Sequence, residues 1–259
     1  MSKQQLDAQF KNVLDRGDKL FVPYIMAGDG GLEKLNDQIK FLETAGASAI
    51  ELGLPFSDPV ADGETIQQAG IRSLKAGTTV KGVFETLKKS KGHKIPIILM
   101  TYMNPVFHYG VENFADACVE AGVSGLIVPD LPMEEESMVS EIFKAHDLAL
   151  IRLVALTSPK SRREALKKRT EGFLYAVTVT GTTGERHTFT ERVDHYLEDL
   201  KQGAHVPVLA GFGISTPDQV KALSKHADGV IVGSRIVKAL HDGDYQVIES
   251  LIHASKKND

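Results

Sequence analysis

Eight short apolar runs recur along the chain, separated by longer stretches in which apolar residues follow helical spacing. The runs are rich in Ile, Val and Leu and show no alternation of apolar and polar positions. Strands that are buried on both faces have this composition, as in a parallel sheet covered by helices. The sequence therefore predicts eight buried strands, at residues 20–26, 48–54, 96–101, 123–129, 148–154, 173–179, 206–210 and 228–233.

The stretches between the runs predict amphipathic helices, among them 32–44, 111–121, 134–146, 160–170, 191–202, 217–225 and 244–256. Strands that alternate with helices of this length indicate βαβ units, and eight units favour closure into a (β/α)8 TIM barrel over an open sheet. The spacing of Leu6, Phe10, Val13 and Leu14 predicts an extra helix before the first strand. We also expect short extra helices in the loops.

The length of the chain agrees with a single barrel domain over residues 1–259, because barrels of this class run to roughly 250 residues. The net charge is −4 with both signs spread along the chain, which does not indicate a nucleic-acid face or a basic membrane patch. No apolar run approaches the roughly 18–20 residues of a membrane span. Cys118 is the single cysteine, so an intramolecular disulfide is impossible and a cytoplasmic location is expected.

A candidate catalytic carboxylate, Glu51, lies near the end of the second predicted strand, between Ile50 and Leu52. Catalytic groups of such barrels lie at the C-terminal ends of the strands and in the loops that follow. A carboxylate there is partly desolvated, which raises its pKa and suits it to proton transfer near neutral pH. The alternative is a structural glutamate that pairs with a Lys or Arg of the barrel.

A second carboxylate, Asp62, lies in the long loop after this strand, just before a helix expected from about Glu64. Turn or helix-cap chemistry is the simpler interpretation of Asp62-Gly63 when the spacing is considered alone. A shared role with Glu51 on one ligand would require the loop to fold back over the mouth of the barrel.

Glycine-containing segments follow the last three predicted strands, at 182–184, 211–215 and 233–234. Barrels commonly bind phosphate with the loops after strands seven and eight, using backbone N–H groups at a helix N-terminus. Glycine lets the backbone approach the phosphate oxygens closely. The pattern therefore predicts a phosphate site, with ordinary glycine turns as the alternative. The polar segment 180–192 is typical of a mobile lid, or of a long surface loop.

Other barrel chemistries lack their usual residues in this sequence. A Schiff-base aldolase needs a lysine at a strand end, and none of the eight apolar runs contains one. A metal-dependent aldolase needs clustered His and carboxylate ligands, whereas the nine histidines are scattered without an HxH or HExxH motif. No GxGxxG or Walker motif is present. We therefore expect acid–base chemistry without metal or cofactor, acting on a small phosphorylated substrate.

The segment ELGLPFSDPVADGETIQ, which begins at Glu51, closely resembles the signature of the tryptophan synthase α-subunit family. The segments PYIMAGD, LMTYMNP, IVPDLP, TGTTG, GFGIS and VGS also match the family, in family order over nearly the whole chain. The family performs the retro-aldol cleavage of indole-3-glycerol phosphate to indole and D-glyceraldehyde 3-phosphate in L-tryptophan biosynthesis. The resemblance implies that this chain is such a lyase.

The resemblance also implies roles for individual residues. Glu51 would help to protonate indole C3 and would take the proton from the glycerol hydroxyl as the C–C bond breaks. Asp62 would accept a hydrogen bond from the indole N–H and stabilise the positive charge that develops on the ring. Tyr175, at the end of the sixth strand, would lie near Glu51, and the lid residue Thr183 would bond to the aspartate. The implied phosphate-binding residues are Gly184, Gly213, Gly233 and Ser234. The implied walls of the indole pocket are Tyr24, Met100, Tyr102, Ile127, Pro129, Leu153 and Phe212.

Two positions depart from the family pattern. Val179 stands where some members carry arginine, and Gly30 stands where proline is common. Either departure could alter the lid or the coupling between subunits, but neither removes a catalytic group.

By the same resemblance, the partner is a β subunit in an α2β2 heterotetramer, and that subunit holds pyridoxal phosphate while this chain holds no cofactor. The segments 55–62 and 102–109 are the expected contact surface. Three alternatives stay open: a stand-alone indole-releasing lyase, a barrel that mainly activates the β subunit, and another phosphosugar enzyme such as an isomerase. The last would be expected to show a Lys or Cys catalyst at a strand end.

Overall fold

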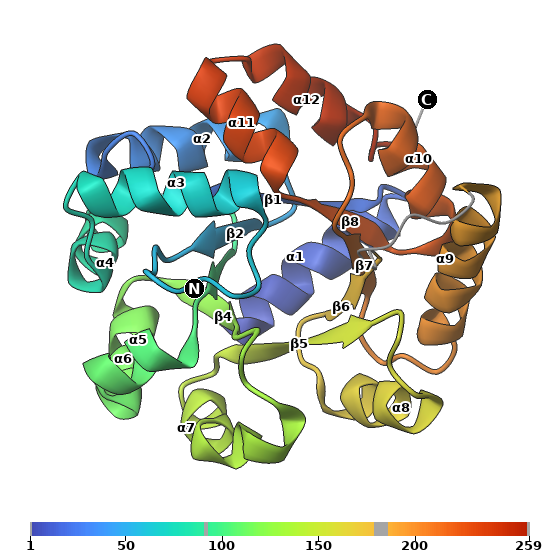
Figure 1. Cartoon of the computed structure of the whole chain (residues 1–259), viewed down its shortest axis with the longest axis horizontal. Coiled ribbons are helices and arrows are strands. Elements are labelled where there is room, and N and C mark those ends of the chain that lie inside the picture. The colour runs from blue at the N-terminus through green and yellow to red at the C-terminus, as the bar shows by residue number, and fades with distance from the viewer. Residues whose placement is uncertain (1, 91–92, 179–185, 258–259) are drawn as a thin grey trace.

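The computed structural model describes residues 2–90, 93–178 and 186–257, with side chains from residue 191 onward in the last range. Eight parallel strands close into a barrel in the order of the sequence, and β8 pairs with β1 (Figure 1). The predicted TIM barrel is confirmed, and every predicted run overlaps its strand. The strands are β1 Leu20–Met26, β2 Ile50–Gly53, β3 Ile97–Met100, β4 Val123–Ile127, β5 Ala149–Ala155, β6 Leu174–Val177, β7 Val208–Gly211 and β8 Gly229–Val232.

Helices surround the barrel, and none of those described is long and apolar enough to cross a membrane. The helix expected from about Glu64 is present, and further helices that the sequence did not single out cover the rest of the connections after β2 and β3. The helices are α1 Lys3–Asp15, η1 Leu32–Lys34, α2 Leu35–Ala45, α3 Glu64–Lys75, α4 Val80–Lys89, α5 Met103–Tyr109, α6 Val111–Glu120, η2 Met133–Met138, α7 Ser140–Ala145, α8 Lys160–Arg169, α9 Arg186–Lys201, α10 Pro217–His226, α11 Ser234–Asp242 and α12 Tyr245–His253.

The helix predicted over 134–146 is divided in the structure. A 3₁₀ helix, η2, is followed by the short α-helix α7, and Val139 between them has φ −134° and ψ −24°, which interrupts helical geometry. The side chain of Glu136 in η2 is buried against Arg152 of β5 instead of facing solvent. The tertiary contact therefore outweighs the helical spacing of the segment.

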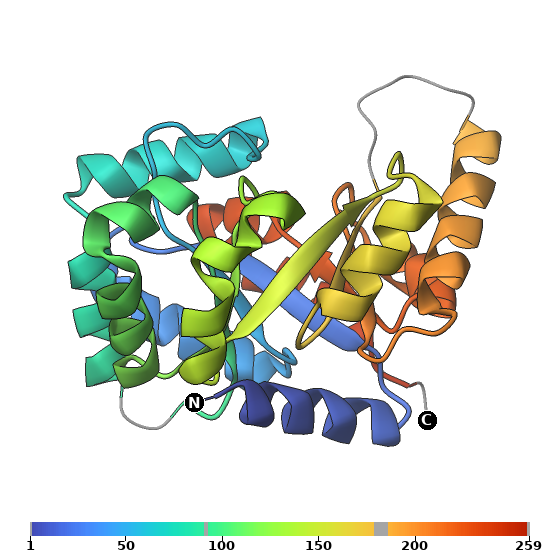
Figure 2. The same ribbon diagram turned by 90° about the horizontal axis from the view of Figure 1, so that it is seen from below.

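The core has two layers, which follow from the alternation of side chains along each strand. Residues such as Ile50 and Leu52 point outward and pack under the helices. Residues such as Ile98 and Leu209 point inward and fill the barrel. Helix α1 lies across one end of the barrel (Figure 2), where its buried Phe10 packs against Phe173 with ring centroids 6.0 Å apart. The N-terminal end of the barrel is thereby closed, and the opposite end is left for chemistry.

Candidate active site

A cavity of about 410 Å³ lies at the C-terminal ends of the strands. Glu51, Asp62 and Tyr175 all line it, so the structure brings the three candidate catalytic residues together. The other predicted residues that line it are Tyr24, Met100, Ile127, Pro129, Leu153, Phe212, Gly213, Gly233 and Ser234. Val179, Thr183 and Gly184 lie outside the described residues, and so do residues 180–185 of the predicted lid.

Glu51 is a buried carboxylate that points into the barrel. Its side chain is on the inward face of β2, and the residue is only 4 % exposed. Its Oε2 has no hydrogen-bond partner, and among the described residues Glu51 forms no ion pair with a Lys or Arg. Burial, with a smaller contribution from the charge of Asp62, raises the pKa of Glu51 to about 8. The described part of the chain thus offers no structural partner for this group, which favours a role in proton transfer.

Asp62 reaches the same cavity because the loop after β2 folds back over the barrel mouth. The backbone N–H of Ala61 donates a hydrogen bond of 3.1 Å to the Tyr102 hydroxyl, which fastens the loop to the segment after β3. Desolvation raises the pKa of Asp62 to about 6, although hydrogen bonding from Tyr102 opposes the shift. Gly63 is the N-cap of α3, and no side chain caps that helix. The helix-cap interpretation of Asp62 is therefore wrong.

Tyr102 and Tyr175 lie at positions that differ from those predicted from the sequence, where Tyr102 was a pocket wall and Tyr175 lay at the end of the sixth strand. Tyr102, predicted as a wall of the indole pocket, is not among the residues that line the cavity; its hydroxyl contacts Asp62 and Ala61, so it supports the loop after β2. Tyr175 is the second residue of β6 and lies deeper than the strand end where we placed it. A Cβ at Gly211 would lie 2.4 Å from Tyr175 Cε1, so glycine at this position makes room for the ring.

The loop after β7 has an unusual backbone that a hydroxyl holds in place. Phe212 and Gly213 both have positive φ, +75° and +77°, and this conformation is uncommon for a residue with a side chain. The Thr178 hydroxyl donates hydrogen bonds to the carbonyls of Gly211 at 2.7 Å and Phe212 at 3.0 Å. Thr178 therefore fixes the loop that presents Gly213 to the cavity.

Of the two helix N-termini near this loop, only that of α11 is open to a ligand. At α10, Thr216 and Gln219 form a capping box. The side-chain amide oxygen of Gln219 (Oε1) also accepts a hydrogen bond of 2.8 Å from the Ser215 N–H. At α11, the N-cap is Gly233 and no side chain caps the helix. Free N–H groups and the positive end of a helix dipole bind anions. The uncapped N-terminus at Gly233 and Ser234 is thus the part of the cavity lining that best suits an anion, and Gly213 lines the same cavity.

The sequence analysis missed two basic residues of the cavity, Arg235 and Lys238. They follow Ser234 by one and four positions on α11, so helical spacing from the predicted phosphate segment could have indicated them. Arg235 lies next to the open N-terminus of the helix, whereas the Lys238 ammonium forms an ion pair with Asp242 at 2.8 Å. Among the described residues, no three His, Cys, Asp or Glu side chains lie close enough together to hold a metal ion.

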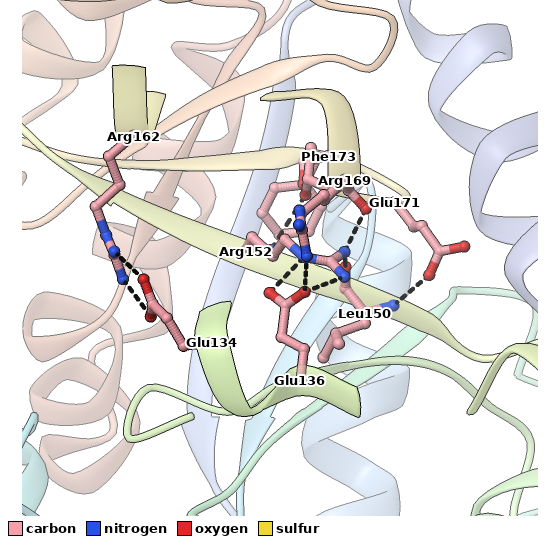
Figure 3. A network of polar contacts seen from close by, with 9 residues as sticks. Glu134, Glu136, Leu150, Arg152, Arg162, Arg169, Glu171 and Phe173 are labelled. Atoms are coloured by element: carbon pink, nitrogen blue, oxygen red, sulfur yellow. Dashed lines mark hydrogen bonds and ion pairs between the residues drawn. The ribbon is translucent and has the colours of Figure 1, made fainter. Parts of the chain in front are cut away.

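A buried ion pair holds the loop after β4, which carries Pro129 of the cavity wall. Arg152 of β5 donates to Glu136 of η2 through Nε at 2.7 Å and Nη2 at 2.9 Å, and both side chains are at most 9 % exposed (Figure 3). In the same loop, the Asp130 carboxylate accepts from the Met103 N–H at 3.0 Å, at the start of α5. Interior contacts thus fix the loops after β3 and β4 relative to each other.

Comparisons with known proteins indicate the family to which the chain is similar. A family model described as "Tryptophan synthase alpha chain" matches residues 10–258. The tryptophan synthase alpha chain of Oceanobacillus iheyensis is 56 % identical over 256 residues, which covers 98 % of each chain. That of Bacillus cereus strain ATCC 10987 is 49 % identical over 260 residues, covering 100 % of this chain and 99 % of the relative.

Solved structures of tryptophan synthase have the same fold as this chain. Tryptophan synthase subunit alpha from Legionella pneumophila superposes with a TM-score of 0.87 at 31 % identity, covering 98 % of both chains. A chain of tryptophan synthase from M. tuberculosis, in an aminoacrylate- and BRD0059-bound form, superposes with a TM-score of 0.89 at 28 % identity and the same coverage.

Proposed function

Because this chain belongs to the tryptophan synthase alpha chain family, we propose that its cavity is the site at which indole-3-glycerol phosphate is cleaved. The chain is a lyase of L-tryptophan biosynthesis, and the products are indole and D-glyceraldehyde 3-phosphate. One observation carries the assignment of the site. Two carboxyl groups from different segments line one cavity, and their environments give them different pKa values, about 8 for Glu51 and about 6 for Asp62.

The two pKa values divide the chemistry between the carboxyl groups. At neutral pH Glu51 is mostly protonated, so it can donate its proton to indole C3. The Asp62 carboxylate is mostly ionised, so it can accept a hydrogen bond from the indole N–H and stabilise the positive charge on the ring. The Glu51 carboxylate then takes the proton of the glycerol hydroxyl next to the ring as the C–C bond breaks. Glu51 is thereby returned to its protonated form, and indole and the aldehyde are released.

The phosphate group is held at the opposite end of the cavity in this proposal. The open N-terminus of α11 with Gly233 and Ser234 provides N–H donors, and Gly213 approaches from the loop after β7. Arg235, which also lines the cavity, balances part of the charge of the phosphate. Gly184 and Thr183 keep the roles that the family resemblance implies, in the lid.

The direct test is release of indole from indole-3-glycerol phosphate by the purified chain, measured with and without a β subunit. We expect indole in both reactions and faster release with the β subunit. Activity of the chain alone at the full rate would favour the stand-alone lyase, and a β-subunit effect without any cleavage would favour the mainly allosteric barrel. No indole in either reaction would refute the proposed function.

We expect kcat/KM for this cleavage to follow a bell-shaped dependence on pH. Activity should rise as Asp62 loses its proton near pH 6 and fall as Glu51 loses its proton near pH 8. Rates measured from about pH 5 to pH 9 in overlapping buffers check this expectation. In Asp62→Asn the limb near pH 6 should disappear, while the Glu51 limb remains but moves to lower pH, because the charge of Asp62 no longer helps to raise the pKa of Glu51. A profile of Asp62→Asn that keeps both limbs would contradict the assignment of Asp62.

A β subunit is the partner of this family, and we propose that it docks on the loops after β2 and β3 to form an α2β2 heterotetramer. Val60 in the first loop is 83 % exposed, and Phe107 of α5 is 50 % exposed. Exposed apolar side chains at the active end of the barrel favour a protein partner there. The predicted contact segment 102–109 is largely the helix α5, whose N-terminus Asp130 holds. The chain itself would need no cofactor, with pyridoxal phosphate in the β subunit, and we place the complex in the cytoplasm.

A charge introduced on this surface should weaken association with the β subunit. We expect Val60→Asp with Phe107→Asp to raise the dissociation constant by about 10-fold or more, since a buried unpaired charge costs well over 1.4 kcal/mol. Val119→Asp is the matched control, because Val119 is 43 % exposed near the end of α6, away from these loops. Isothermal titration calorimetry measures the dissociation constant of the double variant and of the control for the β subunit. An equal loss of affinity in the control would contradict the proposed surface.

A further inference from the structure

Tyr24 lies along the floor of the cavity, between the phosphate end and the carboxylates. It is a residue of β1, it is 5 % exposed, and its register partner on β2 is Glu51. A Cβ built at Gly233 would lie 3.7 Å from Tyr24 Cβ, whereas a Cβ built at Gly53 would lie 2.0 Å from the Tyr24 hydroxyl. The ring therefore spans the distance from the end of β8 to the end of β2.

The hydroxyl of Tyr24 has no partner in the described residues. It is buried, and so is the unpartnered Oε2 of Glu51 on the neighbouring strand. Buried polar atoms are nearly always hydrogen-bonded in native proteins, so each exception needs an explanation. Tyr196 shows the usual case, because its buried hydroxyl donates to the Val154 carbonyl at 2.6 Å. Both residues line the same cavity, so a ligand that fills it is the natural source of the missing partners.

Burial, followed by the charges of Asp62 and Glu51, raises the pKa of Tyr24 above its ordinary value. The hydroxyl therefore keeps its proton near neutral pH and can act as a donor. A donor at this place suits a neutral polar ligand group, such as an alcohol oxygen, because a hydroxyl can accept from Tyr24 and donate to Glu51.

We propose that the Tyr24 hydroxyl donates a hydrogen bond to a hydroxyl of the glycerol chain of the substrate. The inference rests on the proposed function, which places the indole ring at Asp62 and the phosphate at Gly233 and Ser234. The three-carbon chain that joins these groups must then cross the region that Tyr24 spans. Tyr24 thus becomes a substrate-binding residue that selects a polyol linker, beyond its expected place in the wall of the indole pocket.

The test compares Tyr24→Phe with the unaltered chain on two ligands that differ only in the glycerol hydroxyls. One is indole-3-glycerol phosphate, and the other is an indole-3-alkyl phosphate of the same length that lacks both hydroxyls. We expect kcat/KM for the first to fall about 3- to 10-fold, the loss of one neutral hydrogen bond. The inhibition constant of the second should stay the same. The melting temperature should not fall, because the hydroxyl has no partner to lose in the free protein.

Tyr196→Phe is the matched control, since it also removes one buried hydroxyl but a partnered one outside the cavity. It should lower the melting temperature and leave both ligand constants unchanged. If Tyr24→Phe weakens both ligands equally, or melts at a lower temperature like the control, the hydroxyl is structural and the inference is overturned. If the unaltered chain releases no indole at all, the proposed function fails as well, whereas cleavage with an unchanged Tyr24→Phe refutes the inference alone.

Discussion

Glu51→Gln should lower kcat for indole release by at least about 10³-fold, because one group acts first as general acid and then as general base. Glutamine keeps the shape of glutamate but can neither give its proton to indole C3 nor take one from the glycerol hydroxyl. The substrate should still bind, since the phosphate end and Asp62 are unchanged. Single-turnover cleavage and equilibrium binding of indole-3-glycerol phosphate measure the two effects separately.

The same variant should be at least as stable as the unaltered chain at pH 7. The pKa of Glu51 is raised in the folded state from an ordinary 4.5 to about 8, so the folded protein holds a proton that the unfolded chain releases. Stability of the unaltered chain therefore falls as pH rises from about 4.5 to about 8, and the cost at pH 7 is up to about 3 kcal/mol. Urea unfolding at pH 5 and pH 8 should show that Glu51→Gln gains stability over the unaltered chain as the pH rises.

Glu64→Gln is the control for both measurements, because Glu64 is an exposed carboxylate at the start of α3, close to the same loop. It should change neither activity nor the pH dependence of stability. Retained indole release in Glu51→Gln would remove Glu51 from the mechanism, whatever its pKa.

Glu136→Gln should destabilise the fold by about 3 kcal/mol or more, because it leaves the buried Arg152 guanidinium without its counter-charge. Arg152 also donates to the carbonyls of Leu150 and Arg169, so it cannot turn toward solvent without losing those bonds (Figure 3). Removal of one partner from a buried pair is costly even where the pair itself adds little net stability. Urea unfolding monitored by circular dichroism measures the loss.

The chain provides a matched control on the same 3₁₀ helix. Glu134 pairs with Arg162 at 2.7 Å, but both side chains are well exposed, at 57 % and 39 %. Glu134→Gln should change stability hardly at all, since solvent screens such pairs. The double variant Arg152→Met, Glu136→Leu should regain most of the stability that Glu136→Gln loses. Equal losses in Glu134→Gln and Glu136→Gln would show that burial of the pair is not the cause.

The positions of the strands and of Glu51 could be predicted from the sequence because they depend on local pattern. A run such as 48–54 has no polar face, so it must be covered on both sides, and Glu51 is its only charged residue. The glycine segments also follow from local composition. Those after β7 and β8, 211–215 and 233–234, contribute residues to the cavity, whereas 182–184 lies outside the described residues. The helix predicted over 134–146 is divided into η2 and α7, and the first part departs from α-helical geometry where Glu136 forms a buried ion pair with Arg152.

The sequence by itself determined the barrel, the strand that carries the proposed catalytic carboxylate and the glycine segments proposed to bind phosphate, because these follow from the period of side chains and from the small size of glycine. Only the tertiary structure decided that Asp62 faces the cavity through its contact with Tyr102, and that the open helix N-terminus is that of α11 rather than α10. It also showed the unpartnered hydroxyl of Tyr24. The physical reason is closure of the barrel. Closure brings strand ends that are distant in sequence around one cavity, and desolvation, capping and missing hydrogen bonds exist only once those ends have met.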